Sequence, residues 1–261
     1  MSTGLERLAA TLAGMIGDGP RPVVVYAALW PLAHALKLPP HQLTDMVLDM
    51  LDEVVGSGRT LAMPTFTAGY QDGLCDLDAA PSTTGVLSEA FRRRPGVRRT
   101  VSAFFPFAVR GGDADTLVGL RPVDAWGDGS AYDWMERRDA VFLMLGCHPT
   151  HCSYLHRMEW LLADRIPYRF PKAIAGRVRH EGRAFDLTET LFVRSRSPDA
   201  INDFTVLEAP LQAGGMRTER LNGMAVSAMG AQAMRAVTER HLSADPLLVL
   251  KNREDFATRE P

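Results

Sequence analysis

The chain has 261 residues, of which 46% are hydrophobic, and a formal net charge of −2 at pH 7. A chain of this length can bury a full core, and no Pro-, Gly- or Ser-rich linker divides it, so we expect a single domain over residues 1–261. A charge near zero lacks the positive excess of proteins that follow a phosphate backbone, which argues against nucleic-acid binding. Three cysteines do not make a disulfide framework and favour a reducing compartment.

The sequence also lacks the patterns of a secretory leader and of a membrane span. Residues 1–17 carry Glu6 inside an apolar pattern and have no basic leader before an uninterrupted apolar run. No stretch approaches the roughly 18 unbroken apolar residues that a membrane span requires. We therefore expect a cytoplasmic protein with neither a nucleic-acid nor a membrane partner. The sequence leaves the oligomeric state open, with a homodimer as one option.

Helical and strand patterns alternate along the chain. Two strand-like runs between about residues 173 and 193 flank Glu181-Gly182, which predicts a hairpin within a subregion at about residues 170–200. The alternation predicts an α/β fold of three layers, with a central mixed sheet flanked by helices. The other patterns predict helices over residues 3–17, 43–54, 87–94 and 225–241, and buried strands over residues 23–28, 60–63, 140–145 and 247–250.

Residues 143–159 are the most informative segment for function. An apolar strand leads directly into three histidines, two cysteines, hydroxyl groups and a carboxylate. One interpretation makes His156 a general base, with Ser153 and a carboxylate beside it, because imidazole titrates near neutral pH. The other interpretation assigns the cysteines and histidines to a metal ion.

A zinc site is the weaker of these two interpretations. Cys147 and His148 are adjacent in the sequence, as are His151 and Cys152. Structural zinc sites usually pair ligands two to four residues apart and take a second pair from a distant segment, whereas Cys75 stands alone. We therefore expect no metal.

Six segments, in the correct order, resemble the aminoglycoside 3-N-acetyltransferases, a family whose fold differs from that of the GNAT acetyltransferases. The resemblance covers most of the chain. It implies transfer of an acetyl group from acetyl-CoA to an amine of a small molecule. The matching segments are residues 58–67 (family GTLxMPTFT), 81–92 (PSxxGxLxEAxR), 95–100 (PGxxRS), 129–132 (GSPY), 145–159 (LGxxxxxxTxLHxAE), and 203–204 with 221–225 (DFxxxG and VGxA).

The resemblance assigns roles to individual residues. His156 stands at the position of the family's base, and Ser153 replaces a threonine while keeping the hydroxyl that could stabilise the oxyanion. Asp203 and Glu208 are the candidate carboxylates for orienting His156, and the sequence does not decide between them. Glu159 shares a helical face with His156 and can be structural or catalytic. Neither cysteine of the segment is at a nucleophile position, so direct transfer without an acyl-enzyme is expected.

The resemblance also places the two substrates. Acetyl-CoA is the expected acyl donor, and the hairpin subregion is expected on the acceptor side. The expected donor contacts are Ala27, Ala28, Leu29, Ser82, Thr83 and Ser102, and the expected acceptor contacts are Thr65, Phe105, Tyr132 and Glu159.

Two departures from the family pattern concern the binding clefts. Residues 26–29 are Tyr-Ala-Ala-Leu where the family has His-Ser-Ser-Leu, and residues 102–106 are Ser-Ala-Phe-Phe-Pro where it has His-Pro-Thr-His-Ser. These replacements remove hydroxyl donors and add aromatic side chains. In addition, the acidic residues that a polycationic aminoglycoside would need are scattered along the sequence. We therefore favour an amino sugar or amino sugar nucleotide as acceptor. An aminoglycoside-modifying enzyme and a non-catalytic, ligand-binding family member are the alternatives, although the retained His156 argues against the latter.

Overall fold

The structure is a computed structural model that describes residues 3–257, so the ends of the predicted domain, residues 1–2 and 258–261, lie outside it. Its main sheet is mixed, with strand order β4-β5-β2-β1-β6-β10-β9. β1 pairs in parallel with both β2 and β6, and the remaining pairs are antiparallel. The strands are β1 (Val23–Ala27), β2 (Leu61–Pro64), β4 (Arg98–Arg99), β5 (Phe107–Arg110), β6 (Val141–Leu145), β9 (Arg217–Leu221) and β10 (Met224–Gly230).

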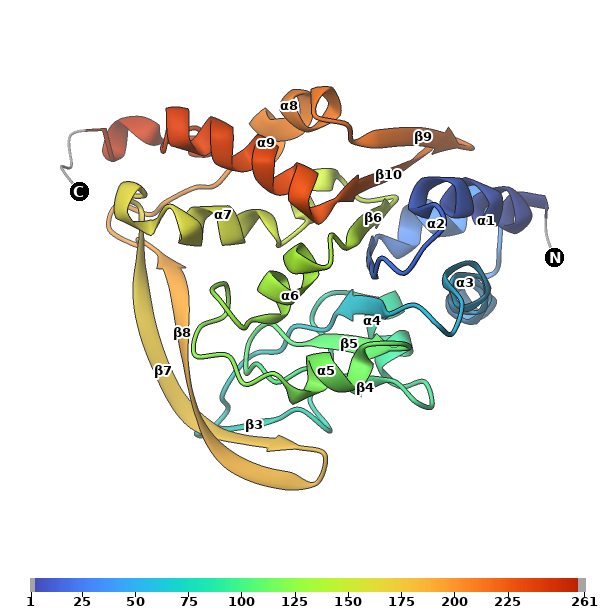
Figure 1. Cartoon of the computed structure of the whole chain (residues 1–261), viewed down its shortest axis with the longest axis horizontal. Coiled ribbons are helices and arrows are strands. Elements are labelled where there is room, and N and C mark those ends of the chain that lie inside the picture. Colours follow the sequence, from blue (N-terminus) through green and yellow to red (C-terminus); the bar gives the residue numbers. More distant parts are fainter. Residues whose placement is uncertain (1–2, 258–261) are drawn as a thin grey trace.

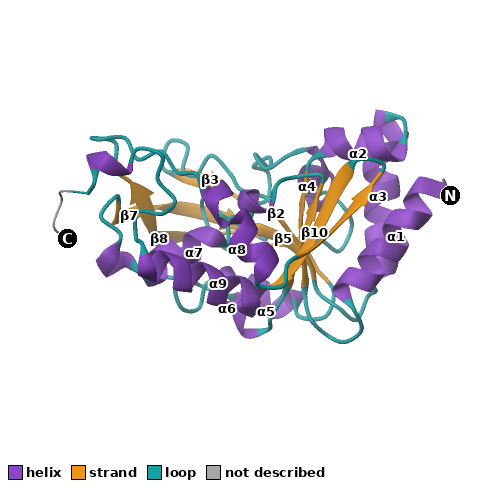
Figure 2. Ribbon diagram, turned by 90° about the horizontal axis from the view of Figure 1, so that it is seen from above, coloured by secondary structure: helices purple, strands orange, loops and turns teal. Residues whose placement is uncertain are grey.

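Helices cover both faces of this sheet, as Figure 2 shows. Val23 and Val25 of β1 pack into one hydrophobic cluster, whereas Val24 and Tyr26 pack into another, because successive side chains of a strand point to opposite faces. Strands buried on both faces read as continuous apolar runs. The first cluster contains side chains of α1 (Thr3–Ile16), α2 (Leu29–Leu36), α3 (Pro40–Val55) and α4 (Val86–Arg92). The second cluster contains side chains of α5 (Ala114–Gly119), α6 (Ala131–Arg137), α7 (Leu155–Leu161), α8 (Glu208–Ala213) and α9 (Ala231–Ala244).

A second, three-stranded sheet is built on a long hairpin that extends away from the main sheet (Figure 1). β7 (Arg169–His180) and β8 (Arg183–Arg194) are antiparallel, and β3 (Leu74–Asp76) pairs in parallel with β7. Glu181 and Gly182 form the turn with φ of 51° and 72°, the backbone that a tight two-residue turn requires. The predicted hairpin is confirmed, and it is longer than its sequence pattern indicated.

The pattern at residues 225–241 is a strand followed by a helix, so the prediction of one continuous helix was wrong. Asn222 and Gly223 adopt φ of 48° and 87° and turn the chain from β9 into β10, where Leu221 pairs with Met224. β10 is almost entirely buried, and a short apolar run of this kind cannot be distinguished from a buried helix by periodicity alone. The helix, α9, begins only at Ala231.

The predicted strand at residues 247–250 was also wrong. These residues form turns, with a single β-bridge between Leu250 and Asn202. Val249 and Leu250 are buried, which explains the apolar pattern, but they pack beside the 200–204 segment without joining a sheet. Within residues 3–257, no helix has both the length and the apolar character needed to cross a membrane.

Candidate active site

The segment that follows β6 carries the candidate site on α7. Gly146 turns the chain out of the strand with φ of 68°, and a Cβ atom there would lie 2.8 Å from Pro31 and 3.1 Å from the sulfur of Met224. Glycine is required at this turn for both reasons. A short 3-10 helix (Pro149–His151) then leads into α7.

A buried ionic network fixes the orientation of α7. Arg157 is almost completely buried and binds two carboxylates of α6, with Nη2 3.0 Å from Asp133 Oδ1 and Nε 2.8 Å from Glu136 Oε2. Tyr154 donates a second hydrogen bond of 2.7 Å to Glu136. Buried charges are tolerated only when they are paired in this way, so α6 and α7 are held in one arrangement.

His156 lies against Glu159 one turn along α7. Its Nδ1 is 2.6 Å from Glu159 Oε2, and the ring is further held by edge contacts with Trp126 and Phe204, at centroid distances of 5.6 and 5.0 Å. Arg169 Nη2 also lies 3.2 Å from Nδ1, but the contact with the carboxylate of Glu159 is much shorter, and a carboxylate can only accept. We therefore assign the imidazole proton to Nδ1. The lone pair is then on Nε2, which no group in residues 3–257 engages. His156 is 31% exposed and lines a cavity of about 270 Å³ together with Phe105 and Trp126.

Glu159 is fully buried, and its carboxylate is surrounded by donors. Besides His156, it accepts hydrogen bonds from Tyr168 (2.8 Å) and Asn202 (3.1 Å) and forms an ion pair with Arg169, whose Nε is 2.9 Å away. Burial raises the pKa of Glu159, but Arg169, His156 and Tyr168 outweigh burial and lower the pKa overall. The carboxylate is therefore ionised, and because it is enclosed it orients His156 and does not contact an acceptor.

The two carboxylates expected to orient His156 are engaged elsewhere. Asp203 accepts hydrogen bonds from the backbone N–H and hydroxyl of Thr205, and Glu208 lies 3.1 Å from Nε2 of His148. The structure therefore corrects this expectation, because the orienting contact belongs to Glu159. The family signature contains this glutamate three residues after the histidine, and helical spacing is the signal that could have identified it.

Ser153 is bonded to two tyrosines. Its Oγ lies 2.8 Å from the hydroxyl of Tyr26 at the end of β1 and 2.8 Å from the hydroxyl of Tyr132 on α6. Tyr132 is buried and stacks on Trp126 at a centroid distance of 4.6 Å, so it supports the cavity wall from behind. Tyr26 was noted in the sequence only as a departure from the family pattern, and its contact with Ser153 depends on the pairing of β1 with β6.

A second cavity, of about 220 Å³, opens at the carboxyl ends of β1 and β2. Ligands of open α/β sheets bind at these strand ends. Ala27 and Ala28 line it as expected, whereas Leu29, Ser82 and Thr83 are not among its lining residues. The residues that line it are Tyr26, Ala27, Ala28, Pro64, Phe66, Thr84, Ser88, Cys147 and His151.

Ser82 and Thr83 lie in the loop before α4 and face other groups. Ser82 Oγ is bonded to Thr84 Oγ1 at 2.8 Å, and Thr83 lines a separate cavity of about 450 Å³ beside residues 67–81. Of the polar residues in this region, the loop residue Thr84 and the α4 residue Ser88 line the cavity at the strand ends in place of Ser82 and Thr83.

Two aromatic rings stand between the cavities. Phe66 lines the cavity at the strand ends and Phe105 lines the cavity of His156, and the two rings meet edge to face at a centroid distance of 5.1 Å. Ser153 links the same two sides, because its partner Tyr26 lines the first cavity and its partner Tyr132 supports the second. The two cavities are therefore neighbours on either side of Phe66 and Phe105.

The cysteines are poor nucleophiles and do not form a metal site. Burial raises the pKa of Cys147 to about 11 and that of Cys152 to about 12, so little thiolate exists near neutral pH. His148 is bonded to Glu208, and His156 to Glu159. In the described part of the chain, no group of three or more His, Cys, Asp or Glu side chains could hold a metal ion.

Ser102 and Thr65 have structural contacts in place of the expected substrate contacts. Both are buried. Ser102 donates a hydrogen bond of 2.6 Å to Glu189, and Thr65 donates one of 3.1 Å to the carbonyl of Pro106 while it accepts one from Arg99. These bonds occupy the groups that were expected to meet CoA and the acceptor, so both assignments are corrected.

Glu189 gives a prediction for stability. Burial raises its pKa to about 7, against a partial lowering by Ser102, so the folded state disfavours the charged form. The buried charge therefore lowers the free energy of unfolding. This loss is absent below pH 4.5, the ordinary pKa that the carboxyl has in the unfolded chain; it increases as the pH rises towards 7 and is constant at higher pH. We expect Glu189→Gln to raise the free energy of unfolding by about 3 kcal/mol at pH 8 and by little at pH 4.5. Urea unfolding at both pH values measures this, and an equal change at both would contradict it.

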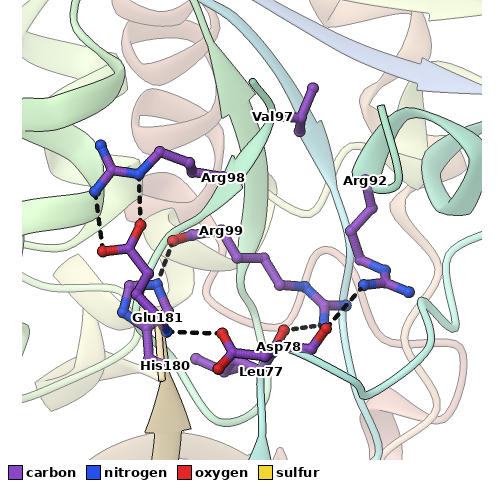
Figure 3. Close-up of a pocket in the computed structure, with 8 residues that line it drawn as sticks. All are labelled: Leu77, Asp78, Arg92, Val97, Arg98, Arg99, His180 and Glu181. Atoms are coloured by element: carbon purple, nitrogen blue, oxygen red, sulfur yellow. Dashed lines mark hydrogen bonds and ion pairs between the residues drawn. The ribbon is translucent and has the colours of Figure 1, made fainter. Parts of the chain in front are cut away.

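A further, polar cavity of about 190 Å³ lies between the β7–β8 turn and the loops around α4 (Figure 3). Its charged groups are bound to one another. Arg98 is paired with Glu181, Arg99 donates to the carbonyls of Leu77 and Ala80, and His180 Nε2 donates to the carbonyl of Arg99 at 2.8 Å. The charges in this cavity are thus largely neutralised within the protein, and its histidine, His180, is buried and bonded to a backbone carbonyl, so the cavity of His156 is the better candidate site.

An α/β fold with an oriented histidine beside two neighbouring cavities is compatible with a group-transfer enzyme. The family model for aminoglycoside 3-N-acetyltransferase matches residues 40–243. The chain belongs to this family, and it is a CoA-dependent N-acetyltransferase. None of the curated proteins matches the sequence significantly.

Solved structures of the family have the same fold. The aminoglycoside acetyltransferase AAC(3)-Xa is 19% identical, with a TM-score of 0.75 over 91% of this chain and 92% of that one. AAC-IIIb in its binary complex with CoASH is 20% identical, with a TM-score of 0.73 over 98% of both chains. AAC-VIa bound to sisomicin is 18% identical, with a TM-score of 0.73 over 92% of this chain and 97% of that one.

Proposed function

We propose that the protein transfers the acetyl group of acetyl-CoA to a primary amine of an amino sugar or related small molecule, with His156 as the general base. The observation that carries the proposal is the contact of 2.6 Å between His156 Nδ1 and the buried Glu159, which leaves Nε2 as the proton acceptor at the cavity wall. An amine becomes a nucleophile only when it has lost its ammonium proton, and a base with a pKa near neutral serves this step best.

The transfer is direct. After the ammonium has lost one proton to solvent, the neutral amine nitrogen attacks the thioester carbonyl and forms the N–C bond. Its second proton passes to His156 Nε2, and the C–S bond breaks. The proton then moves from His156 to the departing thiolate of CoA. The raised pKa values of Cys147 and Cys152 support a route without an acyl-enzyme. Glu159 stabilises the imidazolium that forms between the two proton transfers.

Acetyl-CoA is the donor, and the cavity at the strand ends is its proposed position. The small side chains of Ala27 and Ala28 leave room for the pantetheine arm, and Ser88 offers a hydroxyl group along it. The family neighbour AAC-IIIb is a complex with CoASH. A thioester between the two cavities would meet Ser153. When both tyrosines donate to Ser153 Oγ, the serine hydrogen is free to donate to the thioester oxygen.

The acceptor is proposed to occupy the cavity of His156. Phe105 lines it as expected, and the β7–β8 hairpin contributes Leu191 and Phe192, which supports the acceptor-side role of this subregion. The neighbour AAC-VIa is bound to sisomicin, so an aminoglycoside is the alternative acceptor. A thiol-release assay with acetyl-CoA and a panel of amino sugars, nucleotide-linked amino sugars and aminoglycosides tests the proposal. Absence of release with every amine would support a non-catalytic, ligand-binding protein.

Ser153 gives a prediction for the rate. We expect Ser153→Ala to lower kcat about ten- to a hundredfold, because one donor to the developing oxyanion is lost. Ser153→Thr keeps the hydroxyl and is the matched control, with a rate close to that of the unchanged protein. Steady-state thiol release measures both. An unchanged kcat in Ser153→Ala would limit this residue to a structural role between Tyr26 and Tyr132.

We further propose a fold separate from that of the GNAT acetyltransferases and a cytoplasmic location. The seven-stranded order with β2, β1 and β6 in parallel at its centre, together with the family match, supports the first. The three free cysteines, Cys75, Cys147 and Cys152, support a reducing compartment, in which acetyl-CoA is also available.

A further inference from the structure

We propose that the acceptor of this enzyme carries an anionic group, a phosphate or a carboxylate, which Arg194 and Arg196 bind across the cavity from His156. The inference rests on the proposed function and adds the chemical class of the acceptor. Both arginines line the cavity of about 270 Å³ that His156 also lines. Arg194 is the last residue of β8, which ends beside α7 (Figure 1), and Arg196 follows two positions later.

The charge of this cavity is positive. Three arginines line it, Arg169, Arg194 and Arg196, and no acidic residue is among its lining residues in the described part of the chain. Glu159 is enclosed behind His156 and neutralises Arg169. Asp199 is the acidic residue next to the other two arginines, so two cations share one carboxylate there.

Arg194 and Arg196 are more available to a ligand than Arg169, whose side chain is only 10% exposed and is paired with Glu159. Arg169 donates to the carbonyl of Phe192 (2.9 Å) and to Asn202 (3.0 Å) in addition to its ion pair with Glu159. The side chain of Arg196 is 77% exposed, and its ionic contact within residues 3–257 is a separation of 4.0 Å from Asp199, which is longer than a hydrogen bond.

Arg194 also has hydrogen-bond donors that are not used within residues 3–257 of the protein. It donates one hydrogen bond of 3.0 Å, to the carbonyl of Ala200, and lies 3.9 Å from Asp199. A guanidinium has five N–H donors whose fork matches the oxygens of phosphate and carboxylate. Two adjacent arginines with unused donors are therefore suited to an anion, and they disfavour a polycationic acceptor such as an aminoglycoside.

The remaining surface of the cavity suits the rest of such an acceptor. Phe105, Trp126, Leu191 and Phe192 give apolar walls between the arginines and His156. Aromatic faces pack against the carbon-rich faces of a sugar ring, while the charged groups at the ends fix its direction. An amine held in this way points its nitrogen at Nε2 of His156 while its anion is bound by the arginines.

The phosphates of CoA are a less suitable partner for these arginines. The proposed donor cavity lies on the other side of the contact between Phe66 and Phe105, at the carboxyl ends of β1 and β2. None of the residues lining that cavity is an arginine. The two arginines thus belong to the acceptor side of the site.

The test compares amines that differ only in an anion. Thiol release from acetyl-CoA is measured with glucosamine 6-phosphate against glucosamine, with 4-aminobutyrate against butylamine, and with kanamycin as the polycation. We expect at least one anionic member to have a kcat/KM at least tenfold above that of its neutral partner. The two pairs distinguish a phosphate from a carboxylate, and kanamycin is expected to be the poorest acceptor.

The variant Arg196→Ala assigns the effect to the cavity. We expect it to raise KM for the preferred anionic acceptor about ten- to a hundredfold, with little change in KM for acetyl-CoA or for the neutral partner. Arg183→Ala is the matched control, because it removes the same charge from the opposite end of the same strand, β8, and Arg183 is exposed. It should leave all constants unchanged.

Three results would overturn the inference. Equal use of the anionic and neutral partners, or a preference for kanamycin, contradicts the proposed acceptor class while the transferase activity stands. A higher KM for acetyl-CoA in Arg196→Ala assigns the arginine to the donor. If no amine caused thiol release, the proposed function itself would be contradicted, and with it this inference.

Discussion

Replacing His156 by alanine should reduce amine-dependent CoA release by roughly 10²- to 10⁴-fold, the usual contribution of a positioned general base. No other imidazole lines the acceptor cavity in the described part of the chain. The melting temperature should change little, because the ring is 31% exposed at a cavity wall and not part of a closed core. Thiol-release kinetics and thermal unfolding of the same preparation measure both effects.

A matched variant and a rescue experiment make this result specific. His241→Ala removes a partly buried histidine of α9 whose Nδ1 bonds to the carbonyl of Val237, and it should keep the full rate. Free imidazole added to His156→Ala should restore part of the rate, because the removed ring leaves a cavity of its own shape next to the acceptor. A rate for His156→Ala equal to that of the unchanged protein would exclude this histidine as the base.

The central strands and most helices could be predicted from the sequence because their environment is uniform. β1 and β6 have helices on both faces, so every residue of each strand is apolar, and an apolar run between turn signals is recognisable without coordinates. β10 has the same apolar character, but it continues into α9 without a break. The Asn222-Gly223 turn is the feature that identifies β10 as a strand distinct from α9, because it makes residues 217–230 a hairpin.

The chemistry of the site could be predicted in part. His156 and Ser153 are adjacent in the sequence to the strand that positions them, so a local signature identifies both. The role of Glu159 depends on donors from other elements, Tyr168 and Asn202, which lie 9 and 43 positions away in the chain. The sequence does not distinguish a buried glutamate from an exposed one, and only the fold determines which carboxylate is surrounded by hydrogen-bond donors.

The acceptor cavity was the least predictable part. The basic residues at 194 and 196 look like the solvated end of a strand in the sequence, and nothing in their spacing connects them with a histidine 38 or more positions earlier. The ion pair between Arg169, at the start of β7, and Glu159 fixes the hairpin to α7. Since β7 and β8 pair over their whole length, with Arg169 opposite Arg194, that one anchor also places the end of β8 at the cavity.

Glu159→Gln should lower kcat by roughly 10²- to 10⁴-fold while the fold is retained. The carboxylate accepts the Nδ1 proton of His156 at 2.6 Å, and an amide can instead donate to Nδ1. The proton of the imidazole then moves to Nε2, and the lone pair that should take the proton of the amine is lost. KM for acetyl-CoA should change little, because Glu159 is fully buried and does not line the donor cavity.

A second variant separates this effect from a loss of packing. Tyr168→Phe removes one of the donors to Glu159 but leaves the contact with His156, so it should cost about 1 kcal/mol of stability and less than tenfold in kcat. Because Glu159 also neutralises Arg169, Glu159→Gln should itself lose stability, yet the loss in kcat should persist at temperatures far below its melting transition. If both variants lost activity only in proportion to stability, Glu159 would be a structural anchor of the hairpin and the tautomer of His156 would be set by another group.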